Sequence, residues 1–221
     1  DVFVTYNEDW DNSQLWNYVD LKQLNVGTGS FVGAVFDGQY IYFAPSNNTL
    51  DPTFAARYDT KAGGLTAVQA WQFFDTATLH PDARGFEGTF FDGRYVYMVP
   101  FFGVSEHSGR VARFDTKSGF AFNNPNGWSH FDTTSINQYA KGFLGGSYDN
   151  KRYTFMTPGP GTFDGVGRTQ AIAAKRDTTQ TSLDAGWELF DTQLIAPQLD
   201  GGGPRGFCGT VVAGDYLYFV P

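Results

Sequence analysis

Four copies of one motif, tight Asp-Gly turns inside the copies, and a chain that opens and closes in the middle of a copy predict the fold class. Together they indicate an all-β protein, a four-bladed β-propeller with four strands per blade, whose closing blade is split between the N- and C-terminal strands. Aromatic residues make up 18% of the chain and glycine contributes 27 residues, which supply buried area, strand preference and turns.

The two inner strands of each blade, A and B, are recognised by two landmarks. Strand A opens on an aromatic-X-Gly step, and strand B is an alternating run that ends in proline. The two are joined at Asp37-Gly38, Asp92-Gly93 and Asp149-Asn150, which favour tight hairpins. The aromatic-X-Gly steps are Phe31-Val32-Gly33, Phe86-Glu87-Gly88, Phe143-Leu144-Gly145 and Phe207-Cys208-Gly209, and the B runs are Tyr40 to Pro45, Tyr95 to Pro100, Tyr153 to Pro158 and Tyr216 to Pro221.

The two outer strands, C and D, complete each copy. The landmarks of strand C are Tyr6-Asn7-Glu8, Tyr58-Asp59-Thr60, Phe114-Asp115-Thr116 and Arg176-Asp177-Thr178. Strand D runs from tryptophan to aspartate: Trp16 to Asp20, Trp71 to Asp75, Trp128 to Asp132 and Trp187 to Asp191. We expect the tryptophans to pack between blades and the aspartates to hydrogen-bond to nearby backbone.

The order of these landmarks predicts a single domain over residues 1–221. Its segments are 1–30 (outer strands of the closing blade), 31–85 (blade 1), 86–142 (blade 2), 143–206 (blade 3) and 207–221 (inner strands of the closing blade). Pairing the last two strands with the first two would complete the fourth blade and remove two exposed sheet edges.

The copies resemble β-propeller repeats in general. The size of the chain resembles hemopexin-like four-bladed propellers, and Gly145-Gly146 is similar to the double glycine of kelch repeats, which the other blades lack. Glycine at the start of strand A permits close backbone approach at a narrow axis. The hemopexin-like resemblance implies an ion on that axis, calcium, sodium or chloride; no other cofactor is expected.

Composition and charge exclude several function classes. The formal charge is −8, so the chain should repel nucleic acid and anionic membrane surfaces. No apolar run approaches the roughly 20 residues of a membrane-spanning helix. Cys208 is the only cysteine, which excludes an internal disulfide, and we expect it to be a small buried hydrophobe. The chain opens inside a strand, as a processed N-terminus would, and we expect an extracellular or periplasmic monomer.

Departures from the repeat predict where a site lies. Propeller sites usually occupy the face formed by the D-to-A and B-to-C loops, and the longest of these loops, 159–175 and 192–206, both rise from blade 3. Two residues before the phenylalanine of strand A, three blades carry a cation: Arg84, Lys141 or Arg205. These cations would bind a carboxylate, sulfate or phosphate. Alternatively, they pair with loop acids such as Asp82 and Asp200.

Two residues are candidates for acid–base chemistry. Glu87 stands where the other blades carry apolar residues, so it would act as a general base, an ion ligand or the partner of Arg84. His107 lies beside Glu106 and the pair Phe101-Phe102, and a histidine next to a carboxylate suits proton transfer or metal binding. His80 lies on the same face, but two loop histidines are a weak metal signal.

We therefore expect a binding propeller that recognises a small anionic or carbohydrate-like ligand at this face. The ligand-binding residues would be Arg84, Lys141, Arg205, His80, Phe101, Phe102 and Tyr139. One alternative is an enzyme that acts on a glycan or small metabolite at the same mouth, with Glu87 or His107 as acid or base. The other is a protein-interaction propeller without a small-molecule site.

Overall fold

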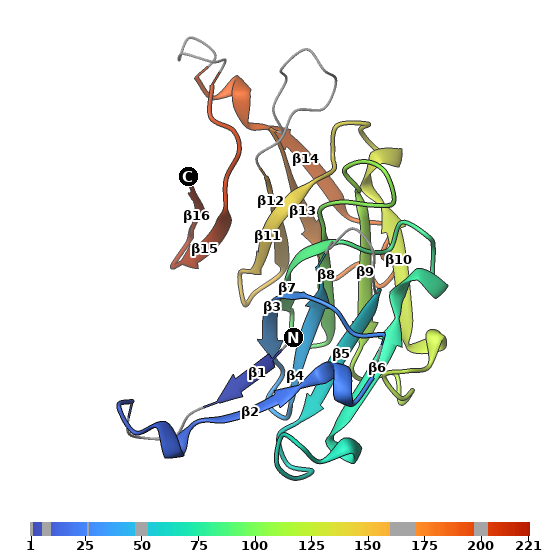
Figure 1. Ribbon diagram of the computed structural model, residues 1–221. Helices are drawn as coiled ribbons and strands as arrows, with labels where there is room; N and C mark the ends of the chain where they lie inside the picture. Colours follow the sequence, from blue (N-terminus) through green and yellow to red (C-terminus); the bar gives the residue numbers. More distant parts are fainter. Residues whose placement is uncertain (1, 6–9, 26, 47–52, 160–170, 197–202) are drawn as a thin grey trace.

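Three four-stranded antiparallel sheets pack side by side in the computed structural model, which describes residues 2–5, 10–25, 27–46, 53–159, 171–196 and 203–221 (Figure 1). Each sheet follows chain order from its inner to its outer strand. Blade 1 contains β3 (Phe31–Phe36), β4 (Tyr40–Pro45), β5 (Phe54–Asp59) and β6 (Trp71–Asp75). Blade 2 contains β7 (Phe86–Phe91), β8 (Tyr95–Pro100), β9 (Arg110–Asp115) and β10 (Trp128–Asp132). Blade 3 contains β11 (Phe143–Tyr148), β12 (Tyr153–Pro158), β13 (Ile172–Asp177) and β14 (Trp187–Asp191).

The remaining strands form two two-stranded sheets, one at each end of the chain. They are β1 (Val2–Thr5) with β2 (Asn17–Asp20), and β15 (Gly209–Ala213) with β16 (Tyr216–Val220). This confirms the predicted fold class, an all-β four-bladed propeller with the closing blade split between the N- and C-terminal strands. The expected pairing of the last two strands with the first two is not observed: within the described residues the two halves are separate sheets without a ladder between β16 and β1, and Figure 1 shows them apart.

A glycine bulge in each inner strand brings the blades into backbone contact. In β3, β7 and β11 the register with the next strand shifts around the glycine of the aromatic-X-Gly step. A Cβ built on Gly33 would lie 3.0 Å from Cα of Gly88, and one on Gly145 would lie 3.1 Å from Cα of Gly209. At Gly209 itself a Cβ would meet no described atom within 4 Å, so the ring is open at this point.

The blade tryptophans pack between neighbouring sheets, as predicted. Phe74 of β6 stacks on Trp128 of blade 2 with the ring centroids 4.6 Å apart, and Phe131 of β10 stacks on Trp187 of blade 3 at 6.1 Å. The indole N–H groups of Trp71, Trp128 and Trp187 donate to the carbonyls of Leu65, Phe122 and Leu183, at 2.8, 2.8 and 2.7 Å. Because each N–H has an acceptor, the buried indoles of Trp71 and Trp128 and the partly buried indole of Trp187 have no unsatisfied polar group.

The aspartate at the end of each outer strand caps a short 3₁₀ helix that turns the chain toward the next blade. Its carboxylate accepts a hydrogen bond from the backbone N–H two residues later, at 3.0 to 3.1 Å. The caps Asp20, Asp75, Asp132 and Asp191 precede η2 (Leu21–Gln23), η4 (Thr76–Thr78), η6 (Thr133–Ser135) and η7 (Thr192–Leu194). Two further 3₁₀ helices, η3 (Val68–Ala70) and η5 (Pro125–Gly127), lead into β6 and β10, and η1 (Ser13–Leu15) lies between β1 and β2.

Two expectations from the sequence are wrong. The third strand of each intact blade begins four residues before its landmark, because small residues such as Ala55 and Ala56, which are poor strand signals, fill its tightly packed start. Cys208 is exposed rather than buried, since the inner strand of the closing half-blade meets no neighbour on its open side. Among the described residues no helix is long and apolar enough to cross a membrane.

Gly33→Ala should lower the free energy of unfolding more than Gly38→Ala. Both glycines have positive φ, +74° and +107°, so both substitutions carry a backbone cost of about 1 kcal/mol. Only at Gly33 would the new methyl press on backbone, which adds roughly 1–3 kcal/mol, whereas the space around Gly38 is empty to 4 Å. Denaturant unfolding measures both losses, and equal losses would show that the inner strands do not touch.

Candidate functional site

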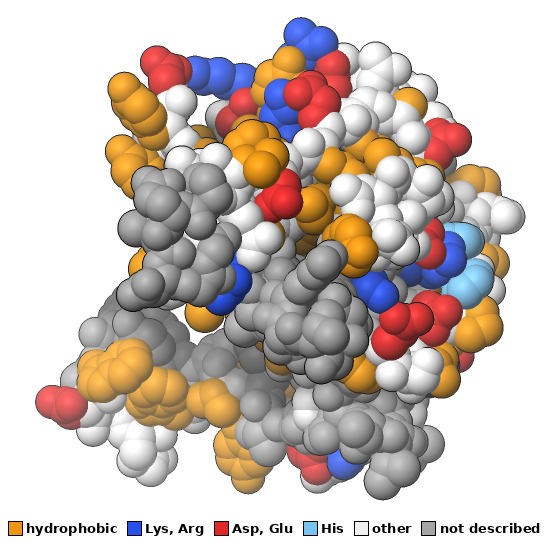
Figure 2. All heavy atoms as spheres, turned by 90° about the horizontal axis from the view of Figure 1, so that it is seen from above, with side chains coloured by type: hydrophobic (Ala, Val, Ile, Leu, Met, Phe, Trp, Pro, Cys, Tyr) orange, Lys and Arg blue, Asp and Glu red, His pale blue; other side chains and the backbone are white. Residues whose placement is uncertain are grey.

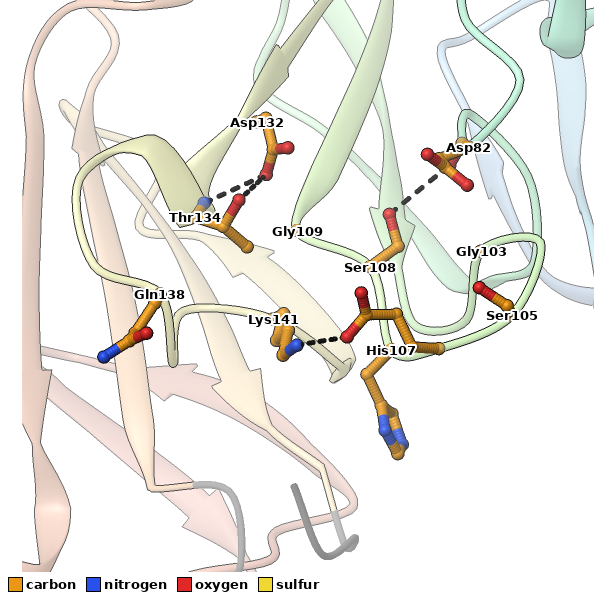
Figure 3. Close-up of a pocket in the computed structure, with 11 residues that line it drawn as sticks. Asp82, Gly103, Ser105, His107, Ser108, Gly109, Asp132, Thr134, Gln138 and Lys141 are labelled. Carbon is orange, nitrogen blue, oxygen red and sulfur yellow. Dashed lines mark hydrogen bonds and ion pairs between the residues drawn. The ribbon is translucent and has the colours of Figure 1, made fainter. Parts of the chain in front are cut away.

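A cavity of about 300 Å³ opens at the end of the blades where the B-to-C and D-to-A loops lie (Figure 3). Its side chains come from three loops: the one between η4 and β7, the one between β8 and β9, and the one that follows β10. The charged and amide groups that line it are Asp82, Glu106, His107, Asp132, Gln138 and Lys141. The cavity lies on the loop face where the sequence predicts a site.

The loop between β8 and β9 folds into a small hairpin. Its backbone is closed by hydrogen bonds from Gly103 N–H to the Glu106 carbonyl at 2.7 Å and from Ser108 N–H to the Phe101 carbonyl at 2.9 Å. A Cβ on Gly103 would lie 2.9 Å from a carboxylate oxygen of Asp82, so a side chain here would displace the Asp82 carboxylate. The hairpin therefore packs directly against the loop that carries Asp82.

Asp82 fastens this hairpin to the rest of the blade. Its Oδ1 accepts from the backbone N–H of Val104 at 3.1 Å, and its carbonyl accepts from the Ser108 hydroxyl at 3.3 Å. Asp82 also has a partner on its other side, because its own N–H donates to Nδ1 of His80 at 3.1 Å. Asp82 thus positions the hairpin that forms this wall of the cavity and connects it to His80.

An ion pair bridges the opposite side of the cavity. Lys141 Nζ donates to Glu106 Oε2 at 2.6 Å, and the lysine is mostly buried while the carboxylate is 74% exposed. His107 lies beside them with its ring edge-on to Phe101 and Phe102, at centroid distances of 5.1 and 5.3 Å. Burial and the charge of Lys141 lower the pKa of His107, and Glu106 opposes them in part. His107 is therefore a neutral imidazole at neutral pH.

A second charged network stands behind Asp132. One oxygen of Asp132 accepts from Arg110 Nη2 at 3.0 Å, and the other accepts from the Thr134 N–H and hydroxyl at 3.0 and 2.6 Å. Arg110 Nη1 also reaches Nδ1 of His130 at 3.2 Å, and the rings of His130 and His80 lie 5.9 Å apart. Figure 2 shows histidine side chains gathered with basic and acidic ones on this part of the surface.

The structure brings together some of the predicted site residues. His107 and Lys141 line the cavity, Phe101 and Phe102 pack on His107, and His80 contacts Asp82 from behind. The other predicted site residues, Arg84, Arg205, Tyr139 and Glu87, are not among the lining residues. Residues 160–170 and 197–202, which include Asp200, most of the predicted loop 159–175 and part of the predicted loop 192–206, lie outside the described residues.

Two of those residues have a defined local environment. Arg84 Nε donates to the Pro81 carbonyl at 2.6 Å, so this cation is engaged by its own loop. Glu87 lies in the inner strand β7, and burial raises the pKa of its carboxyl group. Asp82, which the sequence suggests as a partner for one of the cations, accepts hydrogen bonds from the Val104 N–H and the Ser108 hydroxyl of the hairpin.

Sequence reasoning missed Asp132, His130 and Arg110. Asp132 belongs to a repeated cap position, which favours a purely structural interpretation, and His130 alternates normally within its strand. A comparison of each strand position across the blades is the signal that identifies these three residues.

No protein-family model matches the sequence, and a search of curated proteins finds no match either.

The two charges next to His107 should move its pKa in opposite directions. Lys141→Met removes a charge that disfavours the imidazolium and should raise the pKa of His107, whereas Glu106→Gln removes the opposing carboxylate and should lower it. NMR titration of the imidazole signals tests both, with His130 as the internal control. If the two variants shifted His107 in the same direction, the ion pair would not be beside the ring.

Proposed function

We propose that this protein is a ligand-binding propeller whose loop-face cavity holds a small, polyhydroxylated, carbohydrate-like molecule. The observation that carries the proposal is the cavity itself, which at about 300 Å³ is the size of a small-molecule site and is surrounded by polar side chains from three loops. A rigid β scaffold that presents such loops is a common arrangement for recognition.

The chemistry of the lining suits hydroxyl groups. Carboxylate oxygens of Asp82 and Asp132 can accept from neighbouring hydroxyls, and the amide of Gln138 can both donate and accept. Gln138 is exposed, and the next residue, Tyr139, is 38% exposed and can supply an apolar surface beside the polar groups. A sugar requires this combination of acceptors, donors and one apolar face.

Charge favours a neutral ligand over an anionic one. The lining contains the carboxylates of Asp82, Glu106 and Asp132, and its lysine is already paired with Glu106. Arg110 neutralises Asp132 from behind, so the described lining offers an anion no surplus positive charge. A ligand with a carboxylate or phosphate would have to displace these partners, whereas an uncharged polyol would not.

An acid–base enzyme has one supporting observation, the raised pKa of Glu87. Glu87 lies outside the cavity lining and so does not act there together with His107, which is why binding is the better proposal. The axial ion, calcium, sodium or chloride, stays a prediction, and so does a protein-interaction role.

Gln138→Ala should weaken sugar binding about threefold to tenfold, because it removes one side-chain hydrogen bond to the ligand without touching the scaffold. The matched control is Gln69→Ala, an exposed glutamine in η3, which lies in the loop between β5 and β6. A glycan array followed by calorimetry with the best neutral sugar measures both variants. The absence of binding to any neutral sugar, together with binding to anionic ones, would refute the proposal.

A further inference from the structure

Two histidines lie next to each other behind the cavity wall, with their rings tilted by 42°. His80 belongs to the loop between η4 and β7, and His130 belongs to β10; their ring centroids are 5.9 Å apart. Each has its Nδ1 directed at a group that reaches the cavity. His80 Nδ1 accepts from the N–H of Asp82 at 3.1 Å, and His130 Nδ1 lies 3.2 Å from Arg110, which holds Asp132.

The partners determine the protonation state of both rings. A guanidinium has only donors, so Nδ1 of His130 must be the acceptor and its proton sits on Nε2. Nδ1 of His80 accepts from a backbone N–H in the same way. In this arrangement Nδ1 of each ring is an acceptor without a proton, and the hydrogen bonds of the network depend on that.

These residues depart from the repeat at one place in the molecule. The register pairs Arg110 with the cap Asp132, whereas the other caps face Phe54, Ile172 and Val2. His130 occupies the position of Phe73, Leu189 and Tyr18 in the other blades. Two positions that are apolar in the other blades are therefore polar in blade 2. The residues there, Arg110 and His130, contact each other beside the cavity. A purely structural role would be served by the apolar residues that the other blades use.

We propose that His80, His130 and Arg110 form an acid-sensitive switch that holds the cavity in its binding shape at neutral pH and opens it on acidification. The inference rests on the proposed function for its ligand, but the switch itself is a property of the protein. A proton on Nδ1 of His80 removes the acceptor for the Asp82 N–H. It also places a positive charge 3.8 Å from Asp82 Oδ2, which draws the carboxylate toward the ring and away from the Val104 N–H. The hairpin between β8 and β9 then loses its anchor.

The second ring acts in the same direction. A protonated His130 would face the guanidinium of Arg110 and a protonated His80, and only Asp132 would oppose this repulsion. Nε of Arg110 is buried and has no partner among the described residues, so the guanidinium is held through Asp132 and His130, and a proton on Nδ1 of His130 removes the second of these contacts. Across the cavity, the charged groups are Glu106 and Lys141, which pair with each other, beside neutral His107.

The sign of the effect follows from the direction of the shift. Burial, then Arg110 and His80, lower the pKa of His130 in the folded protein, so the unfolded or opened state binds the proton more readily. The closed arrangement is therefore fully stabilised above the ordinary pKa of histidine and loses stability as the pH falls through the lowered pKa of His130.

NMR on the intact protein tests the switch without any ligand. The chain has three histidines, so their ring signals can be assigned by substitution. We expect the backbone amide signals of Asp82 and Val104 to shift between about pH 7.5 and about pH 5 with the same midpoint as His80 or His130. Amides that stay unchanged while both rings titrate would overturn the inference.

Asparagine variants supply the matched test, because the side-chain oxygen of asparagine replaces the Nδ1 acceptor without titrating. The double variant His80→Asn, His130→Asn should keep the Asp82 and Val104 signals constant over this pH range, whereas the control His107→Asn should retain the wild-type step. With the best neutral sugar, acidification should weaken wild-type binding about tenfold and the double variant less than about twofold. If no sugar binds at neutral pH, the proposed function fails while the amide titration still decides the switch.

Discussion

The stacking of the blades depends on the backbone contact between their inner strands. At Gly33, Gly88 and Gly145 the chain bulges out of the regular ladder with positive φ. A Cβ at Gly33 or Gly145 would press on the backbone of the next inner strand, and one at Gly88 would lie 3.7 Å from Cα of Gly145. This contact sets the spacing of the sheets, and the aromatic pairs such as Phe74 with Trp128 fill the space farther out. Since the loops project from these fixed sheets, the geometry of the cavity is determined at the inner strands.

The space between the sheets also holds polar groups that the aromatic rings shield. The guanidinium of Arg57 lies 4.1 Å from the ring centre of Tyr40, and that of Arg113 lies 3.8 Å from the ring centre of Tyr95. Arg57 donates to the amide oxygen of Gln72 at 2.6 Å and so keeps a hydrogen-bond acceptor despite its burial. Cation–π contacts of this kind lower the cost of buried charge and require one arrangement of neighbouring strands. These contacts therefore favour one specific strand register, and they add to the stabilisation that the apolar core provides.

The fold could be predicted from the sequence because its determinants are local and repeated four times. Turn aspartates, bulge glycines and strand tryptophans each have one physical role, and that role recurs at the same spacing. The candidate site could be predicted only in part. His107 and Lys141 were found as departures within loops, but Asp132 stands at a repeated cap position and His130 at a regular strand position. Their significance depends on the cross-strand neighbour Arg110, and pairing across strands is not visible in a linear spacing.

Asp132 shows how a repeated structural position can also supply a carboxylate to the candidate site. A cap uses one carboxylate oxygen for the backbone of the following 3₁₀ helix, as Asp75 does for Ala77. The second oxygen is then available, and in blade 2 it accepts from Arg110, so the carboxylate at the cavity wall is oriented by both the cap and the cation. Because the same cap hydrogen bond recurs after every outer strand, the scaffold itself orients the acceptor at the cavity wall. In the proposed switch, the position of the Asp132 carboxylate depends on the protonation of the histidines next to Arg110. Only these histidines and Arg110 itself had to differ from the repeat.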